Sequence, residues 1–210
     1  MTALRAHAPR MARADRVAMI LDAAHDAFTQ GGFEQTSVAA IAARIAVVEG
    51  TIYKYFDSKR DLLLAVLARW YRRLLEDGEA LCTPDGNPVD TMAGLIRLHL
   101  QAIHDEPLLC HLMFREFRGA GDYEGSTLHQ LNRRYTGLLT RVIRDGMDDG
   151  SFRAQLPVAL LRDTIYGAIE HHSWHYLSGR GALDVDATAA ALLDVLLQGI
   201  GSSRPGAEHC

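Results

Sequence analysis

Apolar residues near the start of the chain recur at the spacing of helical turns, and short polar or glycine-rich breaks divide them into segments. The first predicted helix has an apolar face made of Val17, Ile20, Leu21, Ala24 and Phe28. The Gly31-Gly32 pair ends this helix, because glycine adopts the left-handed cap conformation at little cost. Thr36 or Ser37 then caps a second helix, whose predicted buried face is Val38, Ile41, Ala42 and Ile45.

Two more helices follow a break near Ala46-Val47. The first is short, runs through Tyr53, and has Ile52, Tyr55 and Phe56 on its inward side. Asp57-Ser58 then caps a long helix with apolar residues at Leu62, Leu63, Val66, Trp70 and Leu74. Two short helices joined by a tight turn and braced by a longer helix on each side form the pattern of a helix-turn-helix.

The rest of the chain keeps the helical period over longer segments. The turn cluster at 83–88 (TPDGNP) marks an internal boundary, and no segment alternates with period two, so no strands are predicted. We expect body helices near 89–104, 107–118, 125–148, 157–178 and 184–200. The predicted fold is all-α with about nine helices. A three-helix head with its N-terminal arm spans 1–57, a helical effector-binding and dimerisation body spans 58–202, and a flexible tail spans 203–210.

Charge and cysteine content narrow the possible function classes. The net charge of −4 looks unfavourable for a nucleic-acid binder, but residues 1–62 hold eight basic and seven acidic residues. The remainder holds 14 basic and 19 acidic residues, so the head is the less acidic part. Cys82, Cys110 and Cys210 lack metal-binding spacing and indicate free thiols in a reducing cytoplasm. No apolar run has the length of a membrane span, so we expect a cytoplasmic protein without a membrane partner.

Residues 31–59 carry the side chains that a DNA-binding motif needs. In a helix-turn-helix, the N-terminal residues of the second helix meet base edges in the major groove. Glycine at 50 permits close backbone approach, and the hydroxyl and ammonium groups that follow suit phosphates or bases. Helix N-termini near Thr36 and Ser58 present free N–H groups to phosphate oxygens. The candidate DNA-contacting residues are Thr36, Ser37, Arg44, Val48, Glu49, Gly50, Thr51, Tyr53, Lys54 and Lys59.

Residues 50–63 (GTIYKYFDSKRDLL) resemble the signature of the TetR family of transcriptional regulators, and the Gly-Phe and Thr-Ser elements upstream keep the family's spacing. The resemblance covers roughly the first third of the chain. It implies that Thr36, Thr51, Tyr53, Lys54 and Lys59 lie where family members touch DNA. It also implies a homodimer on palindromic operator DNA, released by a small molecule, with repression as the family default.

Two positions depart from the family pattern. Ala46 stands in the turn, where the family commonly has glycine, and Val48 stands at the cap of the recognition helix, where it commonly has serine or threonine. Valine cannot accept an N–H bond, and the loss of such a cap costs about 1 kcal/mol. Glu49 offsets part of this through the helix dipole, yet it brings a negative charge toward DNA. Alternatively, Val48 packs against Phe33 or Tyr55, or meets a thymine methyl in the groove.

In the body, residues 162–177 (RDTIYGAIEHHSWHYL) and 189–200 (AAALLDVLLQGI) resemble the C-terminal helices of FadR-like TetR regulators, which respond to long-chain acyl-CoA. The resemblance implies a four-helix dimer interface that includes Gly167, Ala168, His171, His175, Leu192 and Leu196; the alternative is that these residues pack inside one subunit. We expect a small hydrophobic effector, with acyl-CoA as the leading candidate. Its pocket would be lined by Leu95, Leu98, Leu112, Met113, Phe117, Tyr135, Leu138, Tyr166 and Ile169, with Arg115 and Arg118 at the phosphate end.

The sequence lacks the motifs that are typical of metal-binding proteins and enzymes. His171 and His175 share a helix face, but no metal-ligand spacing accompanies them, so we predict neither a metal nor a cofactor. No glutamate has a histidine three residues later, as a helical di-metal enzyme requires. No nucleophile elbow or phosphate loop is present either, so we predict no catalytic residues. The remaining alternative to an enzyme, an interaction bundle without a DNA role, leaves the signature at 50–59 unexplained.

Overall fold

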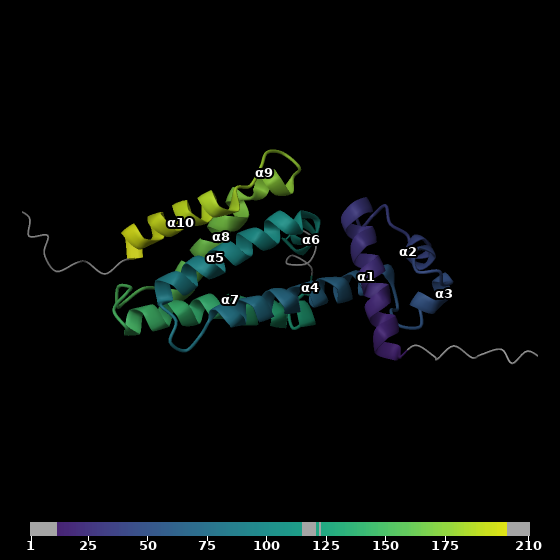
Figure 1. Ribbon diagram of the computed structural model, residues 1–210, viewed down its shortest axis with the longest axis horizontal. Helices are drawn as coiled ribbons and strands as arrows, with labels where there is room; N and C mark the ends of the chain where they lie inside the picture. Colours follow the sequence, from purple (N-terminus) through teal and green to yellow (C-terminus); the bar gives the residue numbers. More distant parts are fainter. Residues whose placement is uncertain (1–11, 115–120, 122, 201–210) are drawn as a thin grey trace, which may run out of the picture. The chain divides into compact units, whose positions relative to one another are not determined.

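The structure is a computed structural model that describes residues 12–114, 121 and 123–200. These residues form helices and contain no strand, which confirms the predicted all-α class (Figure 1). The chain divides into two compact units after Val66, inside a long helix, whereas the sequence pattern placed the boundary before that helix, at 57/58. The physical reason is that Leu62, Leu63 and Val66 are buried and complete the core of the N-terminal unit.

The N-terminal unit, here called the head, contains α1 (Arg13–Gly31), α2 (Val38–Arg44), α3 (Glu49–Ile52) and the start of α4 (Lys59–Leu81). Gly32, at φ 75°, ends α1 and donates its N–H to the Phe28 carbonyl at 3.0 Å, as the glycine pair predicted. Of the two predicted caps for α2, the structure uses Ser37, whose Oγ accepts from the Ala40 N–H at 3.1 Å. The core has Ile20, Ala24, Phe28, Ile41 and Ile52 at its centre.

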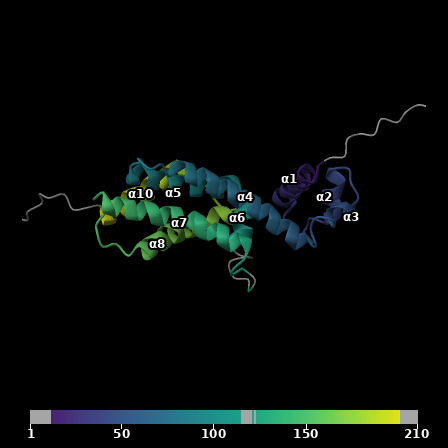
Figure 2. The ribbon, with the colours of Figure 1, turned by 90° about the horizontal axis from the view of Figure 1, so that it is seen from below.

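The C-terminal unit, here called the body, consists of the rest of α4 and six further helices. These are α5 (Pro88–Asp105), α6 (Pro107–Leu112), α7 (Thr127–Asp148), α8 (Val158–His172), α9 (Trp174–Leu177) and α10 (Val185–Ile200). Helix α5 packs against α7 on one side and α10 on another, and α8 packs on α7 (Figures 1 and 2). No helix among the described residues is both long and apolar enough to cross a membrane.

Side-chain caps set the starts of the two longest helices that belong wholly to the body. Asn87 accepts hydrogen bonds from the N–H groups of Val89 and Asp90 at 2.8 and 3.1 Å, and Pro88 occupies the first turn of α5. Ser126 caps α7 by accepting from the His129 N–H at 3.1 Å. The turn cluster predicted at 83–88 therefore ends in a helix start, with the residue types that such a start requires.

The described residues contain ten helices, where the sequence pattern predicted about nine. The difference lies in the segment predicted as one helix over 157–178, which divides at Ser173 into α8 and α9. Ser173 donates its N–H to Ile169 O, and Leu177 donates to Ser173 O, both at 2.9 Å. The helical hydrogen-bond ladder thus continues past Ser173, and the periodicity gave no sign of this local division.

Candidate nucleic-acid interface and effector site

The short helix α3 presents one face to the head's core and another to solvent. Ile52 is buried and anchors the helix, whereas Val48, Glu49, Gly50, Tyr53 and Lys54 are exposed. Thr51 is half-buried. A β-carbon added at Gly50 would meet nothing within 4 Å, so the backbone there is open to close approach. The structure therefore leaves five of the ten predicted DNA-contacting residues exposed at α3 and the residues next to it.

The turn before α3 contains a strained alanine. Ala46 has φ 53°, and it is the one non-glycine residue with positive φ in the described ranges. In this region the β-carbon of an L-residue crowds the following carbonyl, which costs roughly 1–2 kcal/mol. The conformation explains why glycine suits this position, and it makes the departure at Ala46 a local destabilisation of the head.

Val48 occupies the N-cap of α3 with extended backbone at φ −81° and ψ 148°, and no side chain caps the helix. Its side chain is 75% exposed. This exposure is incompatible with the alternative in which Val48 packs against Phe33 or Tyr55. Val48 therefore leaves α3 without a side-chain cap and places an exposed apolar side chain next to the predicted base-contacting residues.

Thr36 differs from its expected role. The residue is only 8% exposed, and its single hydroxyl proton is shared between Gly32 O at 2.7 Å and Ala27 O at 3.1 Å. The side chain therefore faces inward and ties the loop after α1 back to that helix. The sequence pattern missed this because a threonine before a helix is equally typical of a cap.

Lys59 is engaged within the head. Its ammonium group donates to the carbonyls of Phe33, Glu34 and Thr36 at 2.9, 3.3 and 3.1 Å, and lies 4.4 Å from the centroid of the Phe33 ring. These three bonds use all three N–H groups of the ammonium. The phosphate contact expected of Lys59 would require it to release part of this arrangement.

Two further candidates lie on the second helix and its start. Ser37 is exposed but its hydroxyl oxygen caps α2. Arg44 donates to Gln30 Oε1 at 3.1 Å and lines an open groove whose other charged residues are Asp15, Asp22 and Asp26. Such an acidic surface repels phosphates, so this groove itself is not suited to DNA.

Some of the predicted effector residues are buried in the body, and three of them lie close together. A β-carbon added at Gly78 would lie 2.7 Å from Leu138, 3.5 Å from Tyr135 and 3.6 Å from Leu95, so these three side chains converge on α4. Met113, Tyr166 and Ile169 are also buried. Leu98 and Leu112 are half-buried. Arg115, Phe117 and Arg118 lie outside the described residues.

An aromatic cluster inside the body was not predicted. His99 stacks on Tyr135 with ring centroids 5.7 Å apart and meets the edge of Tyr166 at 4.9 Å. Tyr71 lies 5.8 Å from Tyr135 and donates its hydroxyl proton to Asn132 Oδ1 at 2.7 Å. The sequence pattern assigned His99 no role in the body. Its position four residues after Leu95, on the same face of α5, was the signal that placed it in the core.

Burial raises the pKa of both Tyr135 and Tyr166 well above the usual tyrosine range, and the neighbouring Tyr166, Tyr71 and Cys110 raise the pKa of Tyr135 further. Cys82 raises the pKa of Tyr166 further, whereas Arg162 lowers it. Both hydroxyl groups are therefore protonated at neutral pH, and each is able to donate a hydrogen bond.

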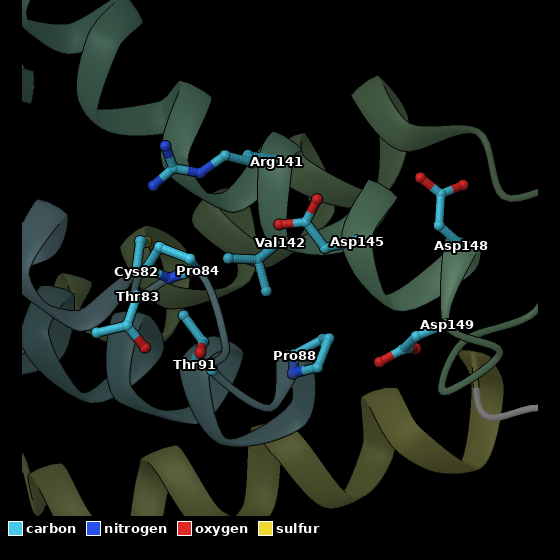
Figure 3. A pocket seen from close by; sticks show the side chains of 11 residues that line it. Cys82, Thr83, Pro84, Pro88, Thr91, Arg141, Val142, Asp145, Asp148 and Asp149 are labelled. Carbon is cyan, nitrogen blue, oxygen red and sulfur yellow. The ribbon is translucent and has the colours of Figure 1, made fainter.

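Two of the surface grooves on the body bear on the effector site. One, of about 460 Å³, has Cys82 and Thr83 from the turn after α4 on one side and Arg141, Asp145 and Asp149 from α7 and its C-cap on the other (Figure 3). None of the predicted effector residues lines it. The second, of about 490 Å³, lies between α7 and α8 and is lined by Asn132, Arg133, Thr136, Arg162, Asp163, Tyr166, Gly167 and Glu170. Within the described part of the chain, no three His, Cys, Asp or Glu side chains gather as a metal site would require.

The predicted dimer-interface residues divide by exposure. Gly167, His171 and His175 are exposed, and Ala168 and Leu192 are half-buried. Leu196 is only 7% exposed, because it faces the core of its own subunit, so its expected place at an interface is not supported. The sequence pattern missed three large exposed apolar residues on the last three helices: Leu160, Trp174 and Val195.

Comparison with known proteins decides the family. Residues 20–66 match the model for bacterial regulatory proteins of the tetR family, and residues 85–200 match a tetracyclin repressor-like C-terminal domain. The chain belongs to the TetR family. It is a ligand-responsive transcriptional repressor of the TetR type and not an enzyme, and regulators of this family bind operator DNA and dimerise. The predicted helix-turn-helix head and helical body are thereby confirmed.

Relatives of this TetR-family chain include repressors and a structure with bound ligand. The chain is 30% identical over 194 residues to the HTH-type transcriptional repressor KstR of Rhodococcus jostii, covering 92% of this chain and 88% of that protein. It is 24% identical over 181 residues to the fatty acid metabolism regulator protein of Bacillus subtilis, covering 86% and 93%. The crystal structure of the transcriptional regulator FadR from Bacillus subtilis in complex with stearoyl-CoA aligns with a TM-score of 0.73 at 24% identity, covering 87% and 98%.

Proposed function

We propose that this chain binds palindromic operator DNA in the cytoplasm as a homodimer, with α3 of each subunit in the major groove. The observation that carries this proposal is the exposed surface of Gly50, Tyr53 and Lys54, held in place by the buried Ile52. Tyr53 and Lys54 supply contacts to phosphates or bases, and Gly50 allows close approach. Thr36 and Lys59 support the same surface indirectly, by fixing the loop before α2.

The test is a gel shift on a palindromic operator over a range of salt concentrations. Lys54→Gln lowers affinity and reduces the salt slope by about one, because one phosphate contact is lost. Tyr53→Ala also weakens binding. The matched control is Arg144→Gln, which removes one exposed positive charge from α7 and leaves the slope unchanged. Wild-type affinity and slope in both the Lys54 and the Tyr53 variant would contradict the proposed docking.

We propose that the effector is a hydrophobic small molecule, with long-chain acyl-CoA as the specific candidate. The support comes from the convergence of Leu95, Tyr135 and Leu138 on Gly78 in the body and from the stearoyl-CoA bound to the Bacillus subtilis relative. Each buried CH₂ contributes about 0.8 kcal/mol, so affinity increases with chain length until the site is filled. A ligand that releases DNA binds the DNA-free protein more tightly by the same factor.

The effector test is release of DNA in a gel-shift titration with acyl-CoAs of increasing chain length. Free fatty acids and CoA alone serve as controls, because each supplies only one part of the ligand. We expect release to strengthen with chain length and to require both parts. Release by none of these compounds, or release that ignores chain length, would reject acyl-CoA as the effector.

We also propose that α8 and α10 form the dimer interface. Helix α10 is rich in alanine, leucine and valine, yet only Val185, Leu196 and Ile200 of its residues are buried within the subunit. Val195 is 67% exposed, and Leu160 at the start of α8 is also exposed. Apolar side chains in such number on two helices favour burial against a second copy.

A further inference from the structure

The hydroxyl of Tyr166 is buried and makes no hydrogen bond to any described residue. The whole side chain is only 8% exposed. Leaving a buried donor unsatisfied destabilises a protein, because the group loses its hydrogen bonds to water and gains none, so such a group needs a physical reason. Burial keeps this hydroxyl protonated, and it is therefore a free donor inside the body.

Tyr166 lies at a border between two environments. Its ring is 4.9 Å from that of His99 and 6.0 Å from that of Tyr135, in the buried aromatic cluster. The same residue lines the polar groove between α7 and α8, where Asn132 and Arg133 also lie. If the apolar chain of a ligand lies in the body and its polar head lies in this groove, the junction between chain and head lies close to Tyr166.

The charged groups of the groove are distributed unevenly. Arg162 is held by Asp163, with Nη2 and Nε at 2.7 and 2.8 Å from the same carboxylate oxygen. Arg133 is exposed, and within the described part of the chain no ion pair or hydrogen bond engages its guanidinium group. Glu170 adds a second carboxylate. Arg133 is therefore the cation available to an anionic group of a ligand.

We propose that the α7–α8 groove binds the polar head of the effector and that the Tyr166 hydroxyl donates a hydrogen bond to its acyl carbonyl oxygen. Arg133 then pairs with an anionic oxygen farther along the head. This inference rests on the proposed acyl-CoA effector, and it gives Tyr166 the role of recognising the thioester. An effector without a carbonyl at that position leaves the hydroxyl unsatisfied and binds more weakly.

The first experiment compares hexadecanoyl-CoA with S-hexadecyl-CoA, a thioether that lacks only the carbonyl oxygen, by isothermal titration calorimetry. Wild-type protein binds the thioester about tenfold more tightly, the size expected for one buried hydrogen bond. Tyr166→Phe removes most of this preference, because it weakens thioester binding and leaves thioether binding nearly unchanged. Equal affinities in wild type, or a preference that survives Tyr166→Phe, would overturn the proposal.

The matched control is Tyr71→Phe, which also removes a buried tyrosine hydroxyl but one that is bonded to Asn132. Without ligand, Tyr71→Phe lowers the melting temperature, whereas Tyr166→Phe leaves it unchanged or raises it. Tyr71→Phe keeps the preference for thioester over thioether. If neither CoA compound binds wild-type protein, the acyl-CoA effector and this inference both fall; binding without discrimination overturns the inference alone.

The second experiment tests the groove with two neighbouring arginines of α7. Arg133→Gln weakens hexadecanoyl-CoA binding several-fold and reduces its dependence on salt. Arg134 is also exposed but pairs with Glu79 at 3.1 Å and does not line the groove, so Arg134→Gln has no such effect. Equal effects of the two substitutions would place the head group elsewhere.

Discussion

Ala46 and Val48 both weaken the start of the recognition helix, for different reasons. Ala46 adopts a left-handed backbone conformation that disfavours a β-carbon, and Val48 leaves the first N–H groups of α3 without a side-chain cap. Both lie beside the proposed DNA-contacting surface. A head that is locally less stable in its free state gains more order when operator DNA binds to it.

Ala46→Gly should increase the free energy of opening of the head by about 1 kcal/mol, because glycine adopts positive φ without steric conflict. Hydrogen exchange of the α1 and α2 amides in the full chain measures this free energy. Ala43→Gly is the control, since Ala43 is exposed in regular helix, where glycine is destabilising by about 1 kcal/mol. We expect Ala46→Gly to raise this free energy of opening and Ala43→Gly to lower it. A lower free energy of opening in both variants would contradict the strain at Ala46.

Val48→Ser should increase stability by about 0.5–2 kcal/mol, because serine accepts an N–H bond at the N-cap and little packing is lost from an exposed valine. The same exchange measurement applies, with Val48→Ala as the control that removes the valine without adding a cap. If serine gives no more stability than alanine, the missing cap is not what limits α3.

At the scale of elements, packing decides more than helix propensity. Helix α3 has four residues, far fewer than an isolated helix needs for stability in water. It persists because Ile52 and Phe56 are buried in the head. At the end of α7, Phe152 is buried and its backbone N–H reaches the Gly146 carbonyl at 2.7 Å, so the chain folds back over the helix there.

Gly146→Ala should destabilise the body by about 1–3 kcal/mol, since a β-carbon at that position would overlap the Phe152 ring. Gly137→Ala, in the same helix, should instead stabilise it by about 0.5–1 kcal/mol, because its β-carbon would meet nothing within 4 Å. Thermal unfolding followed by circular dichroism compares the two. A similar response at both glycines would show that the Phe152 contact does not constrain α7.

At the scale of the whole molecule, function depends on two copies. In TetR-type regulation, an effector in the body alters the fit of two heads to half-sites roughly 34 Å apart. Coupling of this kind requires a stable interface, for which the exposed apolar residues of α8 and α10 are the proposed source. Leu196 is buried inside its own subunit, whereas its neighbour Val195, about 100° farther around the axis of α10, is exposed.

Val195→Glu should convert the dimer to a monomer without unfolding it, because the side chain is 67% exposed in one subunit and would place a charge in the interface. Analytical ultracentrifugation gives the mass, and circular dichroism monitors the fold. Arg144→Glu adds the same charge on α7 and should remain dimeric. A dimer that survives Val195→Glu would move the interface away from this part of α10.

The sequence by itself determined the helical class, the helix-turn-helix at 31–59 and the end of the first helix at the Gly31-Gly32 pair, because these follow from local periodicity and from the backbone freedom of glycine. The importance of Ala46 and Val48 followed from the resemblance to the TetR family, whose pattern differs at these two positions. Only the tertiary structure decided where long or ambiguous side chains point. Lys59 and Thr36 have the chemistry of DNA contacts, yet carbonyls brought near by the loop after α1 engage them. His99 and Tyr166 meet across different helices, and no spacing along the chain records that contact.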